Sequence, residues 1–176
     1  MVEFNKVMKI MEKRKILKII TTSNGEQWFG NGMAAYKIGE ADFSEKSIQP
    51  IIGDLSKWEI YSEADVDGTF ADVSPEDIEA GVYYQFTIKS EKDEYIIFAL
   101  NNGNRIFADS KYFAPIKIDK KHLFYMRSGL LAVKDGLELV ALITPSFYGN
   151  DESNIIAGLT ELGMSLSRLR CGEEEE

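Results

Sequence analysis

Apolar residues recur at spacings of three and four near the start of the chain, at Phe4, Val7, Met8 and Met11. This spacing predicts an amphipathic helix over residues 3–14. The β-rich run 15–22 follows, and Ser23-Asn24-Gly25 is typical of a hairpin turn. Strands are then predicted at 27–29 and 33–38. The first part of the chain is therefore expected to be a helix followed by a meander of strands.

Residues 39–80 show the weakest periodicity. Within them, 55–61 predicts a strand. Ser74 followed by Pro75 is typical of a helix start, with the serine as N-cap and the proline at the first helical position. Gly81 limits that helix to one or two turns.

The β pattern returns after residue 81, and strands are predicted at 82–89, 94–100, 123–126, 130–133 and 137–144. Residues 109–114 predict one or two helical turns that stop before Pro115. A leucine-rich stripe over 154–170 predicts a last helix, and four glutamates end the chain. The order of elements after residue 81 is similar to the order before it.

These elements predict an α+β fold with a largely antiparallel sheet and a few helices. The sequence favours a single domain over 1–150, with similar helix-plus-sheet halves at 1–80 and 81–150. Residues 151–176 are then a C-terminal helix and an acidic tail.

Composition narrows the class of protein. The chain has 176 residues, of which 44% are hydrophobic, which is enough for a core without disulfides or a structural metal. Its single cysteine, Cys171, excludes a disulfide within the chain and fits a reducing compartment. Residues 1–18 are charged throughout and lack the apolar core of a signal peptide. We therefore expect a cytoplasmic protein with no membrane partner.

Three short patterns resemble chemical motifs, and each has a simpler interpretation. Gly30-Asn31-Gly32 lacks the third glycine of a dinucleotide fingerprint and predicts a turn or bulge. Asp65 and Asp67 lack the further ligands of a calcium loop and predict an acidic turn. His122 is the single histidine and has no metal-binding or catalytic partner in sequence. We predict no catalytic residue, no metal site and no cofactor.

The net charge is −9, but the charge is unevenly distributed. Residues 1–21 hold six basic and two acidic residues, and residues 105–127 hold the same numbers. The rest of the chain holds eight basic and 25 acidic residues, which gives −17. The basic residues therefore cluster around the two predicted helical segments of residues 1–150.

The lysines of the first predicted helix fall on one face. At about 100° per residue, Lys6, Lys9 and Lys13 lie together, roughly opposite the apolar stripe. A lysine-rich exposed face is common in charged proteins, so this pattern alone fits a simple solvated surface. It also fits a surface that attracts phosphates without reading bases, with binding that weakens as salt rises.

Three stretches of the second half are similar to the end of sliding-clamp domains: Arg105-Ile-Phe-Ala-Asp-Ser-Lys-Tyr-Phe-Ala-Pro115, Leu123-Phe-Tyr-Met126 and Leu130-Leu-Ala-Val-Lys-Asp-Gly-Leu-Glu-Leu-Val-Ala-Leu-Ile-Thr-Pro-Ser-Phe147. The chain thus resembles the bacterial polymerase processivity clamp and the shorter clamp-like proteins of phages. The resemblance implies domains of two similar halves, with helices lining a hole around duplex DNA. The bacterial clamp has three such domains per chain, whereas this chain has room for one.

The resemblance and the charge pattern together predict a non-enzymatic, clamp-like protein of phage or prophage type that serves as a replication accessory. The residues expected to face the DNA backbone are Lys6, Lys9, Lys13, Lys111, Lys117 and Lys120. A ring of one-domain chains needs several copies, so a homo-oligomer is implied.

Two other functions fit the sequence. Residues 39–94 hold 15 acidic and four basic residues, so the chain could be an acidic protein-interaction or inhibitor module with an unknown protein partner and no DNA role. An enzyme built on scattered carboxylates leaves no short motif and is a third alternative.

Overall fold

The computed structural model describes residues 2–40, 42–89, 94–101, 105–119 and 121–148, and only the backbone of 82–86, 88–89 and 147–148. The helical elements are α1 (Phe4–Arg14), α2 (Glu45–Ile52) and the 3₁₀ turns η1 (Leu55–Lys57) and η2 (Ser110–Phe113). The strands are β1 (Ile16–Thr21), β2 (Gln27–Gly30), β3 (Ala34–Gly39), β4 (Glu59–Ala64), β5 (Ile78–Lys89), β6 (Glu94–Leu100), β7 (Arg105–Asp109), β8 (His122–Arg127), β9 (Leu130–Asp135), β10 (Glu138–Ile143) and β11 (Phe147–Tyr148).

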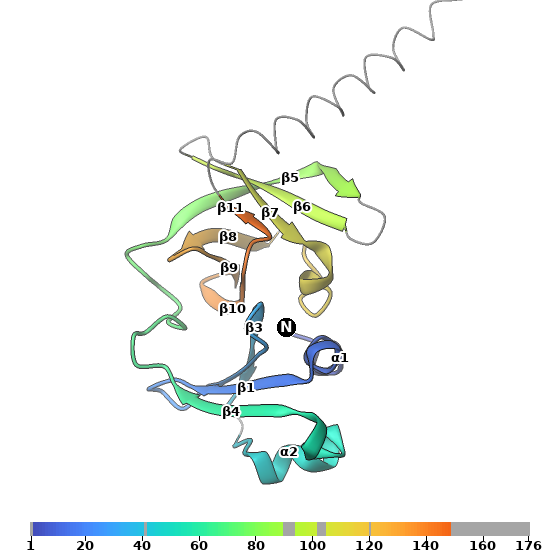
Figure 1. Ribbon diagram of the computed structural model, residues 1–176. Coiled ribbons are helices and arrows are strands. Elements are labelled where there is room, and N and C mark those ends of the chain that lie inside the picture. The colour runs from blue at the N-terminus through green and yellow to red at the C-terminus, as the bar shows by residue number, and fades with distance from the viewer. Residues whose placement is uncertain (1, 41, 90–93, 102–104, 120, 149–176) are drawn as a thin grey trace, which may run out of the picture.

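Hydrogen bonds join the described strands side by side in the order β11-β7-β6-β5-β8-β9-β10-β3-β2-β1-β4 (Figure 1). The β1–β4 pair is parallel, and the other pairs are antiparallel. Near the middle of this order, β3 pairs with β10, with Tyr36 opposite Ala141. The meander β1-β2-β3 lies on one side of this junction, and β8-β9-β10 lies on the other. The predicted α+β class with a largely antiparallel sheet is confirmed.

Helix α1 forms where the spacing of apolar residues predicts it. Val7 and Met11 are fully buried, and Ile10 is nearly so. The helix ends at Lys15, whose backbone is left-handed (φ 55°) and whose N–H bonds to the carbonyls of Met11 and Glu12. The two basic residues of the last turn suit the negative end of the helix dipole.

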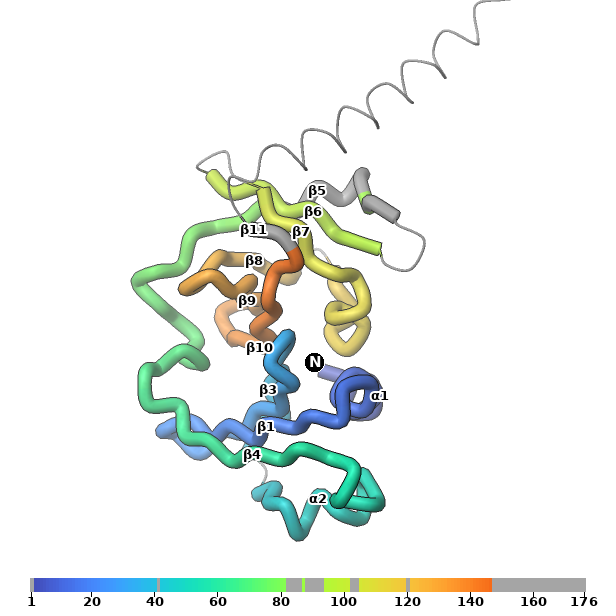
Figure 2. The backbone as a smooth tube through the Cα atoms, in the orientation of Figure 1, coloured from blue at the N-terminus to red at the C-terminus, as the bar shows by residue number. Residues whose placement is uncertain are grey.

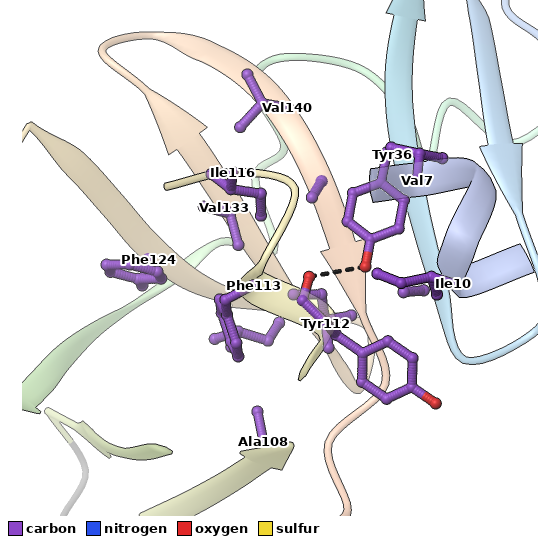
Figure 3. Packing of buried hydrophobic residues seen from close by; sticks show 14 of the residues in the cluster. Val7, Ile10, Tyr36, Ala108, Tyr112, Phe113, Ile116, Phe124, Val133 and Val140 are labelled. Atoms are coloured by element: carbon purple, nitrogen blue, oxygen red, sulfur yellow. Dashed lines mark hydrogen bonds between the residues drawn. The ribbon is translucent and has the colours of Figure 1, made fainter. Parts of the chain in front are cut away.

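The main core fills the space between the sheet and the elements α1, α2 and η2. Figure 3 shows α1 and η2 sharing this core, with Val7 and Ile10 on one side and Tyr112 and Phe113 on the other. The buried Tyr36 hydroxyl of β3 donates a hydrogen bond of 2.7 Å to the Tyr112 carbonyl. The first meander is therefore bound directly to the η2 turn, 76 residues away in sequence.

A smaller apolar cluster lies on the opposite face of the sheet, around Trp28 and Leu142. The segment between β4 and β5 covers this face, and it runs along the side of the sheet away from α1 (Figure 2). Phe70 of that segment packs on Trp28, with ring centroids 4.9 Å apart. Asp65 holds the turn before it, because its carboxylate accepts the backbone N–H groups of Thr69 and Phe70.

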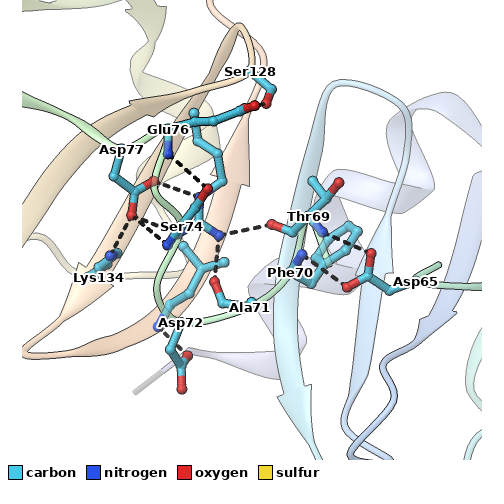
Figure 4. Close-up of polar contacts among 12 residues, drawn as sticks. Asp65, Thr69, Phe70, Ala71, Asp72, Ser74, Glu76, Asp77, Ser128 and Lys134 are labelled. Atoms are coloured by element: carbon cyan, nitrogen blue, oxygen red, sulfur yellow. Dashed lines mark hydrogen bonds and ion pairs between the residues drawn. The ribbon is translucent and has the colours of Figure 1, made fainter. Parts of the chain in front are cut away.

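A buried ionic network holds the end of the segment between β4 and β5 in place (Figure 4). Asp77 accepts hydrogen bonds from Arg127 at 2.7 and 2.9 Å and from Lys134 at 2.8 Å. Arg127 also donates to the carbonyls of Thr69 and Ala71. Burial opposes ionisation of Asp77, but the bonds from Arg127 and Lys134 outweigh it and lower the Asp77 pKa to about 2. The segment 65–77 is thus tied to β8 and β9 by charge as well as by packing.

Residues 39–80 depart most from the sequence predictions. Helix α2 is not predicted by the pattern, although Ser44 and Ser47 form a capping box at its start. Residues 55–57 form the turn η1, and the strand expected at 55–61 begins only at Glu59. The helix predicted at Ser74 and Pro75 is wrong, because those residues form a turn. The Ser74 side chain accepts the Glu76 N–H, but Asp77 turns away to meet Arg127.

The C-terminal helix predicted at 154–170 and Cys171 lie outside the described residues.

Candidate nucleic-acid interface

The lysines of α1 lie on the helix face that the core leaves uncovered. Lys9 and Lys13 are exposed, and Lys6 is half-exposed. Lys9, Lys13 and Arg14 make no ion pair within the described part of the chain. These three cations are therefore available to an external anion.

The start of α1 and the loop after η2 meet at one carboxylate. Glu3 pairs with Lys6 at 3.1 Å and with Lys117 at 2.9 Å. The Glu3 backbone N–H also donates to the Pro115 carbonyl at 2.8 Å. Hydrogen bonds from Lys117 and Lys6 lower the Glu3 pKa. Two of the lysines predicted to face DNA are thus brought together, but an ionised carboxylate offsets part of their charge.

Lys111 extends from the η2 turn. Asp109, the N-cap of η2, accepts the Lys111 backbone N–H at 3.0 Å and also forms an ion pair with the Lys111 ammonium group. The ammonium group lies 5.1 Å from the centre of the Tyr112 ring, within the range of a cation–π contact. The side chain of Asp109 is buried and that of Lys111 is 40% exposed, so Lys111 is the member of this pair that reaches solvent.

A cavity of about 600 Å³ separates the end of α1 from η2. Its wall includes Lys13, Arg14 and Lys111, together with the acidic residues Glu94 and Asp109. The cavity brings together cations that are almost 100 residues apart in sequence. Figure 1 shows the same arrangement of elements, with α1 and the yellow η2 segment next to each other on one side of the sheet.

Asn31 shapes the wall of this cavity and was not identified from the sequence as more than a turn residue. Its buried side chain accepts the backbone N–H groups of Met33 and Ala34 at 3.0 and 3.1 Å. Its amide group lies 3.5 Å from the Ile10 carbonyl of α1. The predicted turn at Gly30-Asn31-Gly32 is confirmed, and it also links the β2–β3 turn to the helix.

The two basic segments thus supply one surface, which we call the α1–η2 seam: Lys6, Lys9, Lys13, Arg14, Lys111 and Lys117. Lys120 lies outside the described residues. Arg127, counted among the basic residues of the second segment, is 1% exposed and paired with Asp77, so it adds no charge to the surface. The seam is basic, but less so than the sequence count implies.

The other candidate motifs have structural roles. His122 is buried, and its Nδ1 atom lies 2.9 Å from the Asp119 carboxylate. Within the described ranges, no three His, Cys, Asp or Glu residues form a group that could hold a metal ion. No helix among the same residues is long and apolar enough to cross a membrane.

A comparison with protein-family models, curated proteins and solved structures finds no match to this chain.

Proposed function

We propose that this chain is a non-enzymatic, clamp-like protein that associates with the backbone of duplex DNA through the α1–η2 seam, as a replication accessory of phage type. The observation that carries the proposal is the shared cavity of Lys13, Arg14 and Lys111. Two segments far apart in sequence, each with a surplus of positive charge, meet there on an otherwise acidic protein.

The order of strands supports a division into two clamp-like halves. Each half would contain a helical element followed by a three-stranded meander: α1 with β1-β2-β3, and η2 with β8-β9-β10. The third strands of the two meanders, β3 and β10, pair antiparallel, as a two-fold relation between the halves requires. In this arrangement η2 takes the place of α1 in the second half, and the two elements lie together.

The chemistry of the seam suits phosphate rather than base recognition. Lysine ammonium groups are flexible point charges that neutralise phosphates without sequence information. An 11-residue helix such as α1 is about 16 Å long, so its lysines would face several phosphates of a duplex. The acidic remainder of the surface would be repelled by DNA, which would orient the seam toward it.

A ring around DNA would require several copies of one chain, so the proposal includes a homo-oligomer. Light scattering on the full chain with and without duplex DNA measures this assembly.

The decisive variant is Lys9→Glu with Lys13→Glu, because both side chains are exposed and neither pairs with a carboxylate in the described part of the chain. We expect salt-sensitive binding to a fluorescent duplex to be lost. In a milder variant with glutamine at both positions, the slope of log K against log salt should fall by about 2. Unchanged binding would exclude the α1 face as the contact.

The matched control is Lys46→Glu with Lys57→Glu. These exposed lysines lie on α2 and η1 and are not part of the seam, and the substitution changes the net charge by the same amount. Equal loss of binding in both variants would mean that overall charge, not the seam, governs the association.

A further inference from the structure

Strand β4 is a free edge of the sheet. It pairs with β1 on one side, and no strand of the described residues pairs with its other side. Its residues are exposed except for Ile60, which is half-buried. An open edge of this kind is able to accept another extended chain as an added strand.

The hydrogen bonds to β1 determine which backbone groups remain available. Glu59 and Asp65 donate their N–H groups to carbonyls at the two ends of β1, those of Lys15 and Thr21. In a strand, alternate residues point their backbone groups to the same side, so the odd-numbered positions face β1. The even-numbered residues Ile60, Ser62 and Ala64 therefore direct their N–H and C=O groups outward. They make no hydrogen bond within the described part of the chain.

Strand β4 has few of the features that protect an edge, and the charged side chains among its residues are Glu59 and Glu63. Residues 59–64 contain no proline and no lysine, and the pairing of β4 with β1 is without a bulge. Helix α2 packs Ile48 into the core on the α1 side of the sheet, and it makes no backbone hydrogen bond to β4 in the described ranges.

The side chains of β4 indicate the chemistry of the partner. Glu59, Tyr61 and Glu63 alternate along one face, and Tyr61 is 46% exposed. Glu63 has one cationic neighbour, Lys18 at 3.0 Å, whereas Glu59 has none in the described residues and accepts only the Tyr61 hydroxyl. A strand beside this face is best matched by basic residues opposite the glutamates and an apolar residue beside the tyrosine.

We infer that β4 takes up an extended, basic segment of a partner protein as a twelfth strand of the sheet. A second copy of this chain fits less well. Antiparallel pairing of two β4 strands about Tyr61 sets Glu59 opposite Glu63, and like charges in direct opposition are unfavourable. The other edge of the sheet, β11, offers only two residues in the described part of the chain. The inference does not depend on DNA binding, because β4 contributes nothing to the α1–η2 seam.

The test uses the full chain and the synthetic peptide Thr-Lys-Val-Val-Thr-Lys-Thr, with binding measured by calorimetry and by backbone NMR shifts. The variant Ser62→Pro removes an outward N–H while leaving the bonds to β1 intact, and proline is tolerated at such edge positions. We expect Ser62→Pro to weaken peptide binding about ten-fold or more, because it removes one hydrogen bond and obstructs the neighbouring ones. The control Ser62→Ala keeps the N–H and should bind as the wild type does.

A second comparison leaves the protein unchanged, in case Ser62→Pro does not fold. Two N-methylated versions of the peptide are compared, each with N-methyl groups on two alternate residues. In the first version these are even-numbered peptide residues, and in the second they are odd-numbered, so the two sets of blocked N–H groups point to opposite edges of the added strand. One edge faces β4 and the other faces solvent, so one peptide should lose binding and the other should retain it. Equal binding by both peptides would overturn the inference, and so would the absence of NMR shifts in β4. Dimerisation that Ser62→Pro abolishes, without peptide binding, would also overturn it in favour of a second copy.

Discussion

Replacing Asp77 with asparagine tests the network that ties segment 65–77 to the sheet. The substitution keeps the size of the side chain but removes the charge that Arg127 and Lys134 share. The side chain of Asp77 is 9% exposed and those of its two partners are 2% and 8% exposed, so both cations would stay buried without a counter-charge. Breaking a buried ion pair by removing one partner typically costs about 3–5 kcal/mol. Because asparagine retains a hydrogen-bond acceptor, we expect a loss near the lower end, about 3 kcal/mol.

The lowered pKa of Asp77, which results from the same contacts, gives the network a pH signature. A fall from 3.8 to about 2 corresponds to about 2 kcal/mol of stability. Since the folded state favours the ionised form, this contribution is fully present above about pH 4 and is lost as the pH falls toward 2. The stability gap between wild type and Asp77→Asn should therefore be widest at neutral pH and narrow between pH 4 and 2.

Urea denaturation at a series of pH values measures that gap wherever both chains remain folded. The control is Asp67→Asn, which removes one negative charge from an exposed position in the same segment. It should change the free energy of unfolding by less than about 0.5 kcal/mol. If Asp77→Asn is no less stable than this control, or if the gap keeps the same width throughout the acid range, Asp77 does not stabilise the fold through its charge.

Two further substitutions test the seam and the junction between the meanders. Glu3→Gln should raise DNA affinity and steepen its salt dependence, because it frees Lys6 and Lys117 from their shared carboxylate. A duplex titration at several salt concentrations measures the slope, and an unchanged slope would refute this prediction. Tyr36→Phe removes the bond to the Tyr112 carbonyl and should cost about 1–2 kcal/mol in urea denaturation. Burial raises the Tyr36 pKa, so the alkaline absorbance titration of the folded protein should be the same in the variant and the wild type.

The sequence predicts the parts of the fold in which local pattern and tertiary packing agree. The i, i+3, i+4 spacing of Val7 and Met11 predicts α1, and both residues are fully buried. The glycine-containing turns predict the meanders, as at Gly136, whose φ of 65° suits the tight connection between β9 and β10. Alternation and turn chemistry are local properties, so they can be read without knowing what the strands pair with.

Residues 39–80 could not be predicted in the same way, because their structure depends on distant partners. Ser74 followed by Pro75 is a sound helix start, but Asp77 is recruited by Arg127, 50 residues away, and the chain extends into β5 instead. Helix α2 carries Pro50 inside its eight residues, which weakens the helical signal in the sequence. The pairing of β3 with β10 also joins segments about 100 residues apart, and no local pattern encodes it.

The same dependence on distant partners limits what a charge count can say about the seam. The sequence predicts that six lysines face DNA, but Lys6 and Lys117 share Glu3, and Lys111 is paired with Asp109. Three cations, namely Lys9, Lys13 and Arg14, make no ion pair in the described ranges, and each phosphate contact contributes about 0.9 to the salt slope. One copy of the chain should therefore bind a duplex weakly, with a slope of about −3 rather than the −5 that six free lysines would give. Tight association would then require several copies acting together, so the oligomeric state and the DNA affinity have to be measured at the same protein concentration.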